Sequence, residues 1–183
     1  MATIIEAENM TLVGYDPTPE VLIGASGDEI IRLSGNANSG TATTSFTGLP
    51  PGIYDINVVY FDESDGESDA EFRVNGTAVD SWTFDSSPGG TRPTLDNRVT
   101  RTISGVSLAS NDSLELFGTR NQGENARFDY IELIPVDLFP DAVDDSETTP
   151  EDTPVTINVT GNDTDVLVDG IPTGQINITT QPT

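Results

Sequence analysis

The chain has 183 residues, 34% of them hydrophobic, and a formal net charge of −24 that comes from 31 acidic residues against seven arginines and no lysine. Cysteine and histidine are absent, which excludes disulfides, thiolate metal sites and the commonest general base. So acidic a surface repels nucleic acid and anionic membranes, and no stretch reaches the ~18–20 apolar residues of a membrane span. We therefore expect neither nucleic acid nor membrane as a partner.

Strand-like runs recur along the first 135 residues with turn signals between them, and no run has helical apolar spacing. In the clearest run, four apolar residues from Tyr54 to Tyr60 alternate on one face. Asn75-Gly76 is typical of a type I′ hairpin turn. Eight or nine short strands without helices predict an all-β jelly-roll β-sandwich. The expected strands are 3–8, 28–33, 41–47, 53–62, 69–75, 77–85, 98–104, 112–118 and 127–134.

The composition changes near Pro135. All seven arginines precede this residue, whereas the 10 acidic residues after Val136 have no basic residue among them. Prolines also bracket the segment that joins the two parts, which is typical of a linker. We predict a β-sandwich domain over 1–135, a linker over 136–141 and a second β-rich unit over 142–183.

The first and last predicted strands of this domain each carry carboxylates beside apolar residues. Alternation along the first strand puts Ile4, Glu6 and Glu8 on one face, and in the last strand Asp129 shares a face with the apolar residues after it. An unpaired buried carboxylate is too costly to keep. Ca²⁺ held by oxygen ligands would join the two strands, and the alternative is that both strands simply expose their acids.

These two segments also carry a family resemblance. The opening I-E-A-E-x-M at 5–10 and the closing D-Y-I-E-L at 129–133, around one β-rich domain, resemble the carbohydrate-binding modules of families 6, 35 and 36. The resemblance covers about residues 3–135 and implies a galactose-binding-like sandwich with a structural calcium between the two segments. It implies Glu6, Glu8 and Asp129 as side-chain ligands, completed by backbone carbonyls from 28–32 and by water.

The resemblance also implies a sugar site on loops at one end of the sandwich, with aromatic rings beside polar groups. No Trp or Tyr stands at the loop positions that match, and the only tryptophan lies in a predicted hairpin strand where core packing is its simpler interpretation. The candidate sugar-binding residues are Asn36, Asn38, Arg92, Asn125, Arg127 and Trp82.

Arginine stands where aromatic residues are missing. Five of the seven arginines lie between positions 92 and 127. Guanidinium pairs in a bidentate way with carboxylate or sulfate, so the cluster favours uronic or sulfated sugars as ligands. Alternatively, these arginines pair with neighbouring carboxylates such as Asp96, Glu115 and Glu124.

The segment 62–69 holds five carboxylates around Gly66. Its spacing does not match the EF-hand loop, but closely spaced carboxylates repel one another unless they are neutralised. One prediction is a second, weaker Ca²⁺ bound by Asp62, Asp65 and Asp69. The alternative is a solvated hairpin tip whose charges discourage pairing of strand edges.

The second unit contains A-x-D-D-x, E-D-T-P-V-x-I and N-D-T-D in that order, which resembles bacterial cadherin-like or immunoglobulin-like tandem repeats. It is much shorter than the ~100 residues of such a sandwich, so we interpret it as a truncated repeat.

Two functions fit the sequence. The first is non-catalytic, calcium-stabilised binding of an acidic or sulfated polysaccharide by a secreted or cell-surface bacterial protein. The alternative is a structural or adhesin module of a large calcium-binding repeat protein, with neighbouring domains as partners. Catalysis is not expected, because without His, Cys or Lys only carboxylate chemistry such as glycoside hydrolysis remains.

Overall fold

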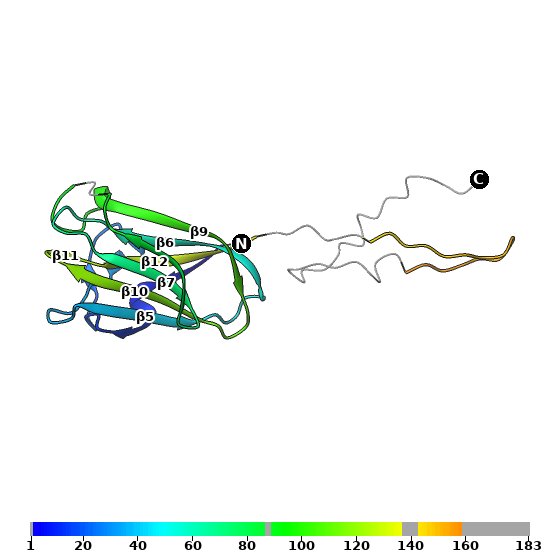
Figure 1. Ribbon diagram of the computed structural model, residues 1–183, viewed down its shortest axis with the longest axis horizontal. Helices are drawn as coiled ribbons and strands as arrows, with labels where there is room; N and C mark the ends of the chain where they lie inside the picture. The colour runs from blue at the N-terminus through cyan, green and yellow to red at the C-terminus, as the bar shows by residue number, and fades with distance from the viewer. Residues whose placement is uncertain (1, 87–88, 137–142, 159–183) are drawn as a thin grey trace. The chain divides into compact units, whose positions relative to one another are not determined.

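The structure is a computed structural model that describes residues 2–86, 89–136 and 143–158. The chain divides into two compact units, Met1–Val136 and Asp137–Thr183. The first unit is an all-β sandwich, as predicted, and its only helical segments among the described residues are three short 3₁₀ turns (Figure 1).

Two antiparallel sheets form the sandwich. The four-stranded sheet has the order β1 (Thr3–Glu6), β12 (Arg127–Pro135), β6 (Gly52–Phe61), β9 (Arg98–Leu108). The six-stranded sheet has the order β2 (Thr11–Val13), β5 (Ser39–Ser45), β10 (Ser113–Asn121), β7 (Asp69–Val74), β8 (Thr77–Thr83), with β11 (Glu124–Asn125) also paired to β10. A small ribbon pairs β3 (Glu20–Val21) with β4 (Glu29–Ile30), and the 3₁₀ turns are η1 (Ala7–Asn9), η2 (Ser26–Asp28) and η3 (Leu95–Asn97).

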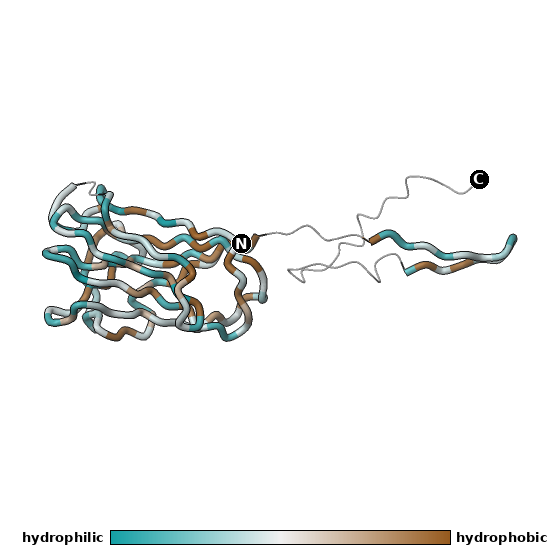
Figure 2. Tube along the Cα trace, viewed as in Figure 1, coloured by the Kyte–Doolittle hydropathy of each residue, from teal (hydrophilic) through white to brown (hydrophobic). Residues whose placement is uncertain are grey.

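The core lies between the two sheets, and β6 follows the predicted alternation. Its residues Tyr54 to Tyr60 at every second position belong to one buried cluster with residues of β7 and β10. Within this cluster the rings of Tyr60 and Phe84 lie 4.2 Å apart. Each fully buried large apolar side chain contributes about 1.5–3 kcal/mol by leaving water, so this cluster supplies much of the stability of the sandwich. Figure 2 shows hydrophobic residues recurring along the strands and hydrophilic residues in many of the loops.

The predicted hairpin at Asn75-Gly76 is confirmed. Both residues have positive φ, at 52° and 76°, and β7 and β8 pair directly on either side of them. A type I′ turn requires this conformation at both central positions, which is why Asn-Gly serves there.

The alternation predicted for the first strand is wrong, because β1 ends at Glu6, Glu8 lies in the 3₁₀ turn η1, and Ile4 is half exposed. In the last strand Asp129 and the apolar residues two and four positions later are all buried, as predicted. The register between β12 and β6 shifts between Phe128 and Tyr130, which makes Asp129 the extra residue of a β-bulge. The bulge interrupts the two-residue period only at this point, because Phe128 and the residue three positions later both enter the core.

Other predicted strands differ mainly at their ends. The predicted strand 28–33 shrinks to β4 followed by isolated bridges, whereas 98–104 and 112–118 extend to Leu108 and Asn121. The short strands β2, β3 and β11 carried no sequence signal that was recognised, because two or three residues show no periodicity.

The second unit differs from its prediction where it can be followed. Residues 143–158 form no strand, so the strand predicted from E-D-T-P-V-x-I is not present in this range. The N-D-T-D turn, most of the linker and the rest of 142–183 lie outside the described residues.

None of the helices in the part of the chain that the structure describes is long and apolar enough to cross a membrane.

The close approach of β10 to the start of β12 predicts that Gly118→Ala destabilises the sandwich. A Cβ at Gly118 would lie 2.3 Å from the Cβ of Ala126 and 2.6 Å from the hydroxyl of Tyr15. Overpacking of this kind typically costs about 1–3 kcal/mol. Urea unfolding should show this loss, whereas Gly35→Ala, where a Cβ meets nothing within 4 Å, should leave the midpoint almost unchanged. Equal midpoints for the two variants would contradict the packing argument.

Candidate functional site

Three carboxylates from separate elements meet around η2. Glu6 ends β1, Glu8 lies in η1, and the bulge of β12 supplies Asp129. The Ser26 hydroxyl donates to Glu6 Oε1 at 2.6 Å, and the Ser26 N–H donates to Asp129 Oδ1 at 3.0 Å. A Cβ at Gly27 would lie 3.3 Å from Glu8 Oε1. We call Glu6, Glu8, Asp129 and Ser26 the clamp cluster.

The clamp cluster contains buried oxygen atoms without hydrogen-bond partners. These atoms are Glu6 Oε2, Glu8 Oε2 and Asp129 Oδ2. Burial raises the pKa of Asp129 to about 6, and the charges of Glu6 and Glu8 add to the rise while the Ser26 N–H opposes it. Burial also raises the pKa of Glu8, with further repulsion from Glu6 and Glu29. A neutralising cation would stabilise the ionised form of these carboxylates, as the charge of Arg98 already does in part for Asp129.

The donor set of the clamp cluster fits a hard cation. All its donors are oxygens, which Ca²⁺ prefers, and three unpartnered carboxylate oxygens are oriented into buried space. Within residues 2–86, 89–136 and 143–158, however, no three Asp, Glu, His or Cys side chains are already drawn together as a complete metal-ligand group. The sequence identified the three acids but missed Ser26 and Gly27 of η2. The family resemblance had implied backbone carbonyls of residues 28–32 as the remaining calcium ligands.

A second polar cluster lies where the acidic loop 62–68 folds against β11. The Glu124 carboxylate accepts the N–H groups of Glu63 at 2.8 Å and Ser68 at 3.0 Å, and the Ser68 hydroxyl donates to the Glu124 carbonyl. Asp62, Glu63 and Ser68 are buried, so the loop is not the solvated tip that was one of the two predictions. The loop is instead a packed element centred on Glu124.

The three acids predicted to hold a second calcium have different partners. Asp62 Oδ2 accepts the N–H of Ser86 at 2.9 Å, and Asp69 Oδ1 accepts the hydroxyl of Thr83 at 2.9 Å. Asp65 has one buried carboxylate oxygen without a hydrogen-bond partner. A second Ca²⁺ at these residues stays a prediction.

The alternative prediction for the arginine cluster, pairing with carboxylates of the chain itself, holds in the described structure for two of its five members, Arg101 and Arg127. Arg127 is buried and bonds Glu63 at 2.5 Å and Glu20 at 3.1 Å. Four arginines form such ion pairs in the described structure, namely Arg32, Arg73, Arg101 and Arg127. Of the carboxylates named in advance, Glu115 pairs with an arginine, Arg73. The guanidinium of Arg127 is thus already engaged inside the domain.

The loops beside this cluster bring several predicted sugar-binding residues to one end of the sandwich. Arg120 donates to Asn125 Oδ1 at 2.8 Å and to the Gly35 carbonyl at 2.9 Å, while its backbone N–H donates to the Asn38 carbonyl. The loop 85–97 joins the acidic loop through the Ser64 N–H bond to the Gly90 carbonyl. The side chains of Asn36, Asn38 and Arg92 are exposed at this loop end.

Trp82 belongs to the core. It is 9% exposed, and its ring packs 5.8 Å from that of Tyr60 in the main buried cluster. The simpler interpretation of the sequence is therefore confirmed, and Trp82 supplies no open platform at the loop end.

Comparison with known proteins gives relatives in sequence and in fold. The chain matches no protein-family model. It is 35% identical over 140 residues to a probable α-glucuronidase A of Aspergillus oryzae, covering 73% of this chain and 17% of the relative. It is likewise 35% identical over 138 residues to the α-glucuronidase A of Aspergillus tubingensis, covering 72% of this chain. The chain spans about one sixth of the length of these curated relatives.

Solved structures of carbohydrate-binding modules show the same fold. A family 35 carbohydrate-binding module of Clostridium thermocellum superposes with a TM-score of 0.56 at 18% identity, covering 74% of this chain and 99% of the module. The family 35 module of Paenibacillus barcinonensis superposes with a TM-score of 0.52 at 19% identity, covering 73% of this chain and 99% of the module. A family 36 module from the hindgut metagenome of Trinervitermes trinervoides gives 0.51 at 18% identity. The first unit therefore has the fold of carbohydrate-binding modules.

The buried acids of the loop end predict a pH-dependent stability. Burial raises the pKa of Glu63 from 4.5 to about 7, although Arg127 opposes the rise, and it raises that of Glu124 to about 7. An acid with a raised pKa in the folded state binds its proton more tightly when folded. Its stabilisation is therefore present at acidic pH and is lost as the pH rises through about 7.

Unfolding at saturating calcium should therefore show a domain that is less stable at pH 8 than at pH 5. Glu63→Gln should flatten this dependence, because glutamine keeps an oxygen for Arg127 but does not titrate. Glu67→Gln, an exposed change in the same loop, should leave the profile as it is. A wild-type domain whose stability rises from pH 5 to pH 8 would contradict the raised pKa values of Glu63 and Glu124.

Proposed function

We propose that residues 1–135 form a non-catalytic, calcium-stabilised carbohydrate-binding module for an acidic extracellular polysaccharide. The observation that carries the proposal is the likeness of fold to solved carbohydrate-binding modules over 99% of the length of each solved chain. The sequence relatives add support, because the matched segment is only about one sixth of enzymes that are named for their action on glucuronides. A small separate segment of a large enzyme suits a binding role better than the catalytic one.

The loop end supports an acidic ligand. The relatives' name concerns glucuronic acid, a sugar with a carboxylate. Among the described residues Arg92 is exposed and forms no ion pair with a carboxylate of the domain, unlike Arg127. A free guanidinium pairs with a uronate carboxylate or a sulfate in a bidentate way, and exposed amides of Asn36 and Asn38 would bond sugar hydroxyls. Arg127 would not contact the sugar but would hold the acidic loop 62–68 in place through its ion pair with Glu63.

Calcium would serve stability in this proposal. Glu6, Glu8 and Asp129 would hold the ion, which supplies the positive charge that their buried oxygens need. Because these residues belong to β1, η1 and β12, the ion would tie the first strand of the domain to the last. Binding to the folded state alone adds its binding free energy to folding stability.

Chelation should lower the thermal midpoint of the domain by several degrees, because loss of the ion leaves three buried acids to repel one another. Asp129→Asn should lower the midpoint in calcium and remove the response to chelator. Asp96→Asn, on the exposed turn η3, is the matched control and should respond as the wild type does. A midpoint that ignores chelator at low calcium would refute the clamp, and calorimetric titration with Ca²⁺ gives an independent count of sites.

Binding to oligogalacturonate or a sulfated polymer should exceed binding to neutral glycans at the loop end. Arg92→Ala should weaken oligogalacturonate binding about tenfold, the loss of one charge-assisted pair. Arg101→Gln is the matched control, because this arginine is already paired with Asp80 at 2.8 Å. A glycan array with and without calcium, followed by calorimetry, tests this. Oligogalacturonate binding that is unchanged in Arg92→Ala would contradict the placement of the acidic-sugar site at Arg92.

The second candidate function is a structural or adhesin unit of a repeat protein, at the cell surface or secreted. It rests on the repeat-like motifs after residue 142 and on the net charge of −24, which would draw calcium between neighbouring units. Sedimentation of the full chain separates the two functions. Calcium-dependent association without binding of any glycan would favour the structural one.

A further inference from the structure

The hairpin tip between β7 and β8 carries a chemically reactive pair of residues. Asn75 is the only asparagine in the sequence that is followed by glycine. Glycine has no side chain to hinder attack by its own backbone nitrogen on the side-chain amide of the residue before it. Both residues of the pair are exposed, and a Cβ built on Gly76 would meet nothing within 4 Å. The tip is therefore open to the water that such a reaction consumes.

The reaction is deamidation, and its atoms balance with water alone. The Gly76 nitrogen loses its proton and bonds to the side-chain carbonyl carbon of Asn75, and the side-chain nitrogen takes up a proton and leaves as ammonia. Water then opens the cyclic imide at either of its carbonyl carbons. One opening gives aspartate, and the other gives isoaspartate, in which the main chain runs through the former side chain. Neither step needs an oxidant, a reductant or an enzyme.

The fold holds the Asn75 side chain away from this reaction. Its Nδ2 donates to Asp112 Oδ1 at 2.8 Å, and its Oδ1 accepts the N–H of Ser113 at 2.9 Å. The backbone N–H of Asn75 donates to the Ser113 carbonyl at 2.8 Å, so this contact continues the pairing of β7 with β10 by one position. Both ends of the side-chain amide are thus engaged by residues at the start of β10. Ring closure requires the amide to leave these partners and approach the Gly76 nitrogen.

The acceptor Asp112 is itself held in its charged form. Its other carboxylate oxygen accepts the N–H of Ala109 at 2.7 Å, and this bond together with the Asn75 amide keeps the pKa of Asp112 below its ordinary value. A hydrogen bond to a charged acceptor is stronger than one between neutral groups, although solvent weakens it at the surface. Asp112 is therefore the side chain that restrains the Asn75 amide.

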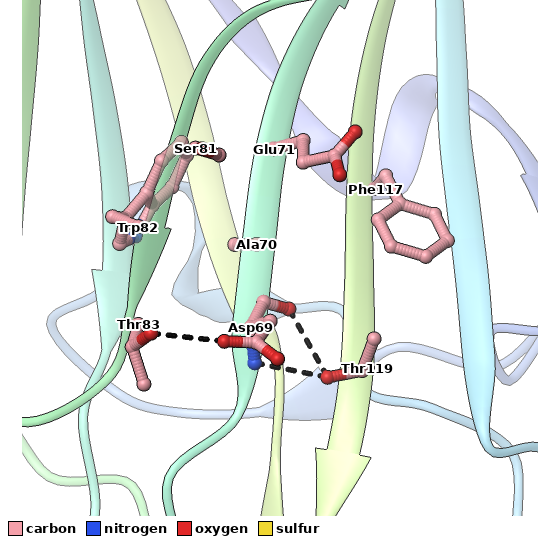
Figure 3. Close-up of a pocket in the computed structure, with 8 residues that line it drawn as sticks. All are labelled: Asp69, Ala70, Glu71, Ser81, Trp82, Thr83, Phe117 and Thr119. Atoms are coloured by element: carbon pink, nitrogen blue, oxygen red, sulfur yellow. Dashed lines mark hydrogen bonds between the residues drawn. The ribbon is translucent and has the colours of Figure 1, made fainter.

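The far end of the same hairpin has anchors of its own. There Asp69 Oδ1 accepts the Thr83 hydroxyl at 2.9 Å, and the Asp69 N–H donates to the Thr119 hydroxyl at 2.9 Å (Figure 3). Between the two ends, Phe72 of β7 is buried in the core. The tip can therefore open locally while the rest of the hairpin stays in the sheet, because local opening does not require unfolding of the domain.

We propose that Asn75 is the site at which this domain deamidates, and that Asp112 and Ser113 set the rate by holding its amide in the hairpin tip. Either product would disturb the tip. Aspartate would place a second carboxylate against Asp112, and isoaspartate would add a main-chain carbon to a two-residue turn whose geometry fixes the strand register. Modification would therefore loosen the pairing of β8, which is an edge strand of the six-stranded sheet.

Incubation of the full chain at pH 8, both folded and in urea above its unfolding midpoint, followed by peptide mapping with mass spectrometry, tests the proposal. Asn75 should be converted faster than any other asparagine, and more slowly in the folded chain than in urea. Asp112→Ala should accelerate the reaction in the folded chain about fivefold, the effect of one lost hydrogen bond on a local opening equilibrium. Thr83→Val removes one hydrogen bond at the far end of the hairpin and is the matched control, which should react at the wild-type rate.

Gly118→Ala separates local from global opening, because it should lower the unfolding midpoint without touching the hairpin tip. Its Asn75 should therefore also react at the wild-type rate. A rate that is unchanged in Asp112→Ala, or that follows the unfolding midpoint across these variants, would overturn the proposal. Faster conversion of another asparagine in the folded chain would overturn it as well. Asn75→Asp should unfold at a lower urea concentration than the wild type, and an equal midpoint would overturn the predicted effect of the product.

Discussion

The burial of carboxylates is the constraint on which the rest of this structure depends. Removing an ionised acid from water is costly unless charge or hydrogen bonds replace the solvent. This domain replaces the solvent in different ways. Glu124 receives two backbone N–H groups, Glu63 pairs with the buried Arg127, and Asp129 receives one N–H and lies near two further acids. The chain itself supplies the hydrogen-bond donors of Glu124 and Glu63, whereas Asp129 keeps one buried oxygen without a partner, which is where we propose a cation.

The same constraint explains where the arginines go. In a chain of net charge −24, most guanidinium groups are used to neutralise acids within the domain, as Arg127 does between Glu63 and Glu20. Few basic groups are left to meet an acidic ligand, so recognition at the loop end would depend on Arg92.

Irregular backbone segments position the carboxylates of the clamp cluster. A regular β12 would keep the two-residue period, but the bulge at Asp129 breaks it and leaves one carboxylate beneath η2. The 3₁₀ turn η1 follows β1 directly, so Glu6 lies at the end of the strand and Glu8 lies within the turn. A bulge reorients a side chain at the cost of a local break in the ladder, and the pairing of β12 with β6 continues on both sides of it.

The sequence by itself determined the elements whose signal is local. The alternation of Tyr54 to Tyr60 predicted the core face of β6, and Asn75-Gly76 predicted the hairpin between β7 and β8. Both signals are local, because side-chain period and turn chemistry act over a few residues. It also predicted Glu6, Glu8 and Asp129 as neighbours, from a family resemblance and from an alternation that holds for Asp129 but not for Glu8. Only the tertiary structure decided the rest.

Ser26 meets Asp129 across 103 positions, and Glu63 meets Glu124 across 61. No spacing in the chain encodes these contacts, since they depend on strand order and register rather than on neighbours in sequence.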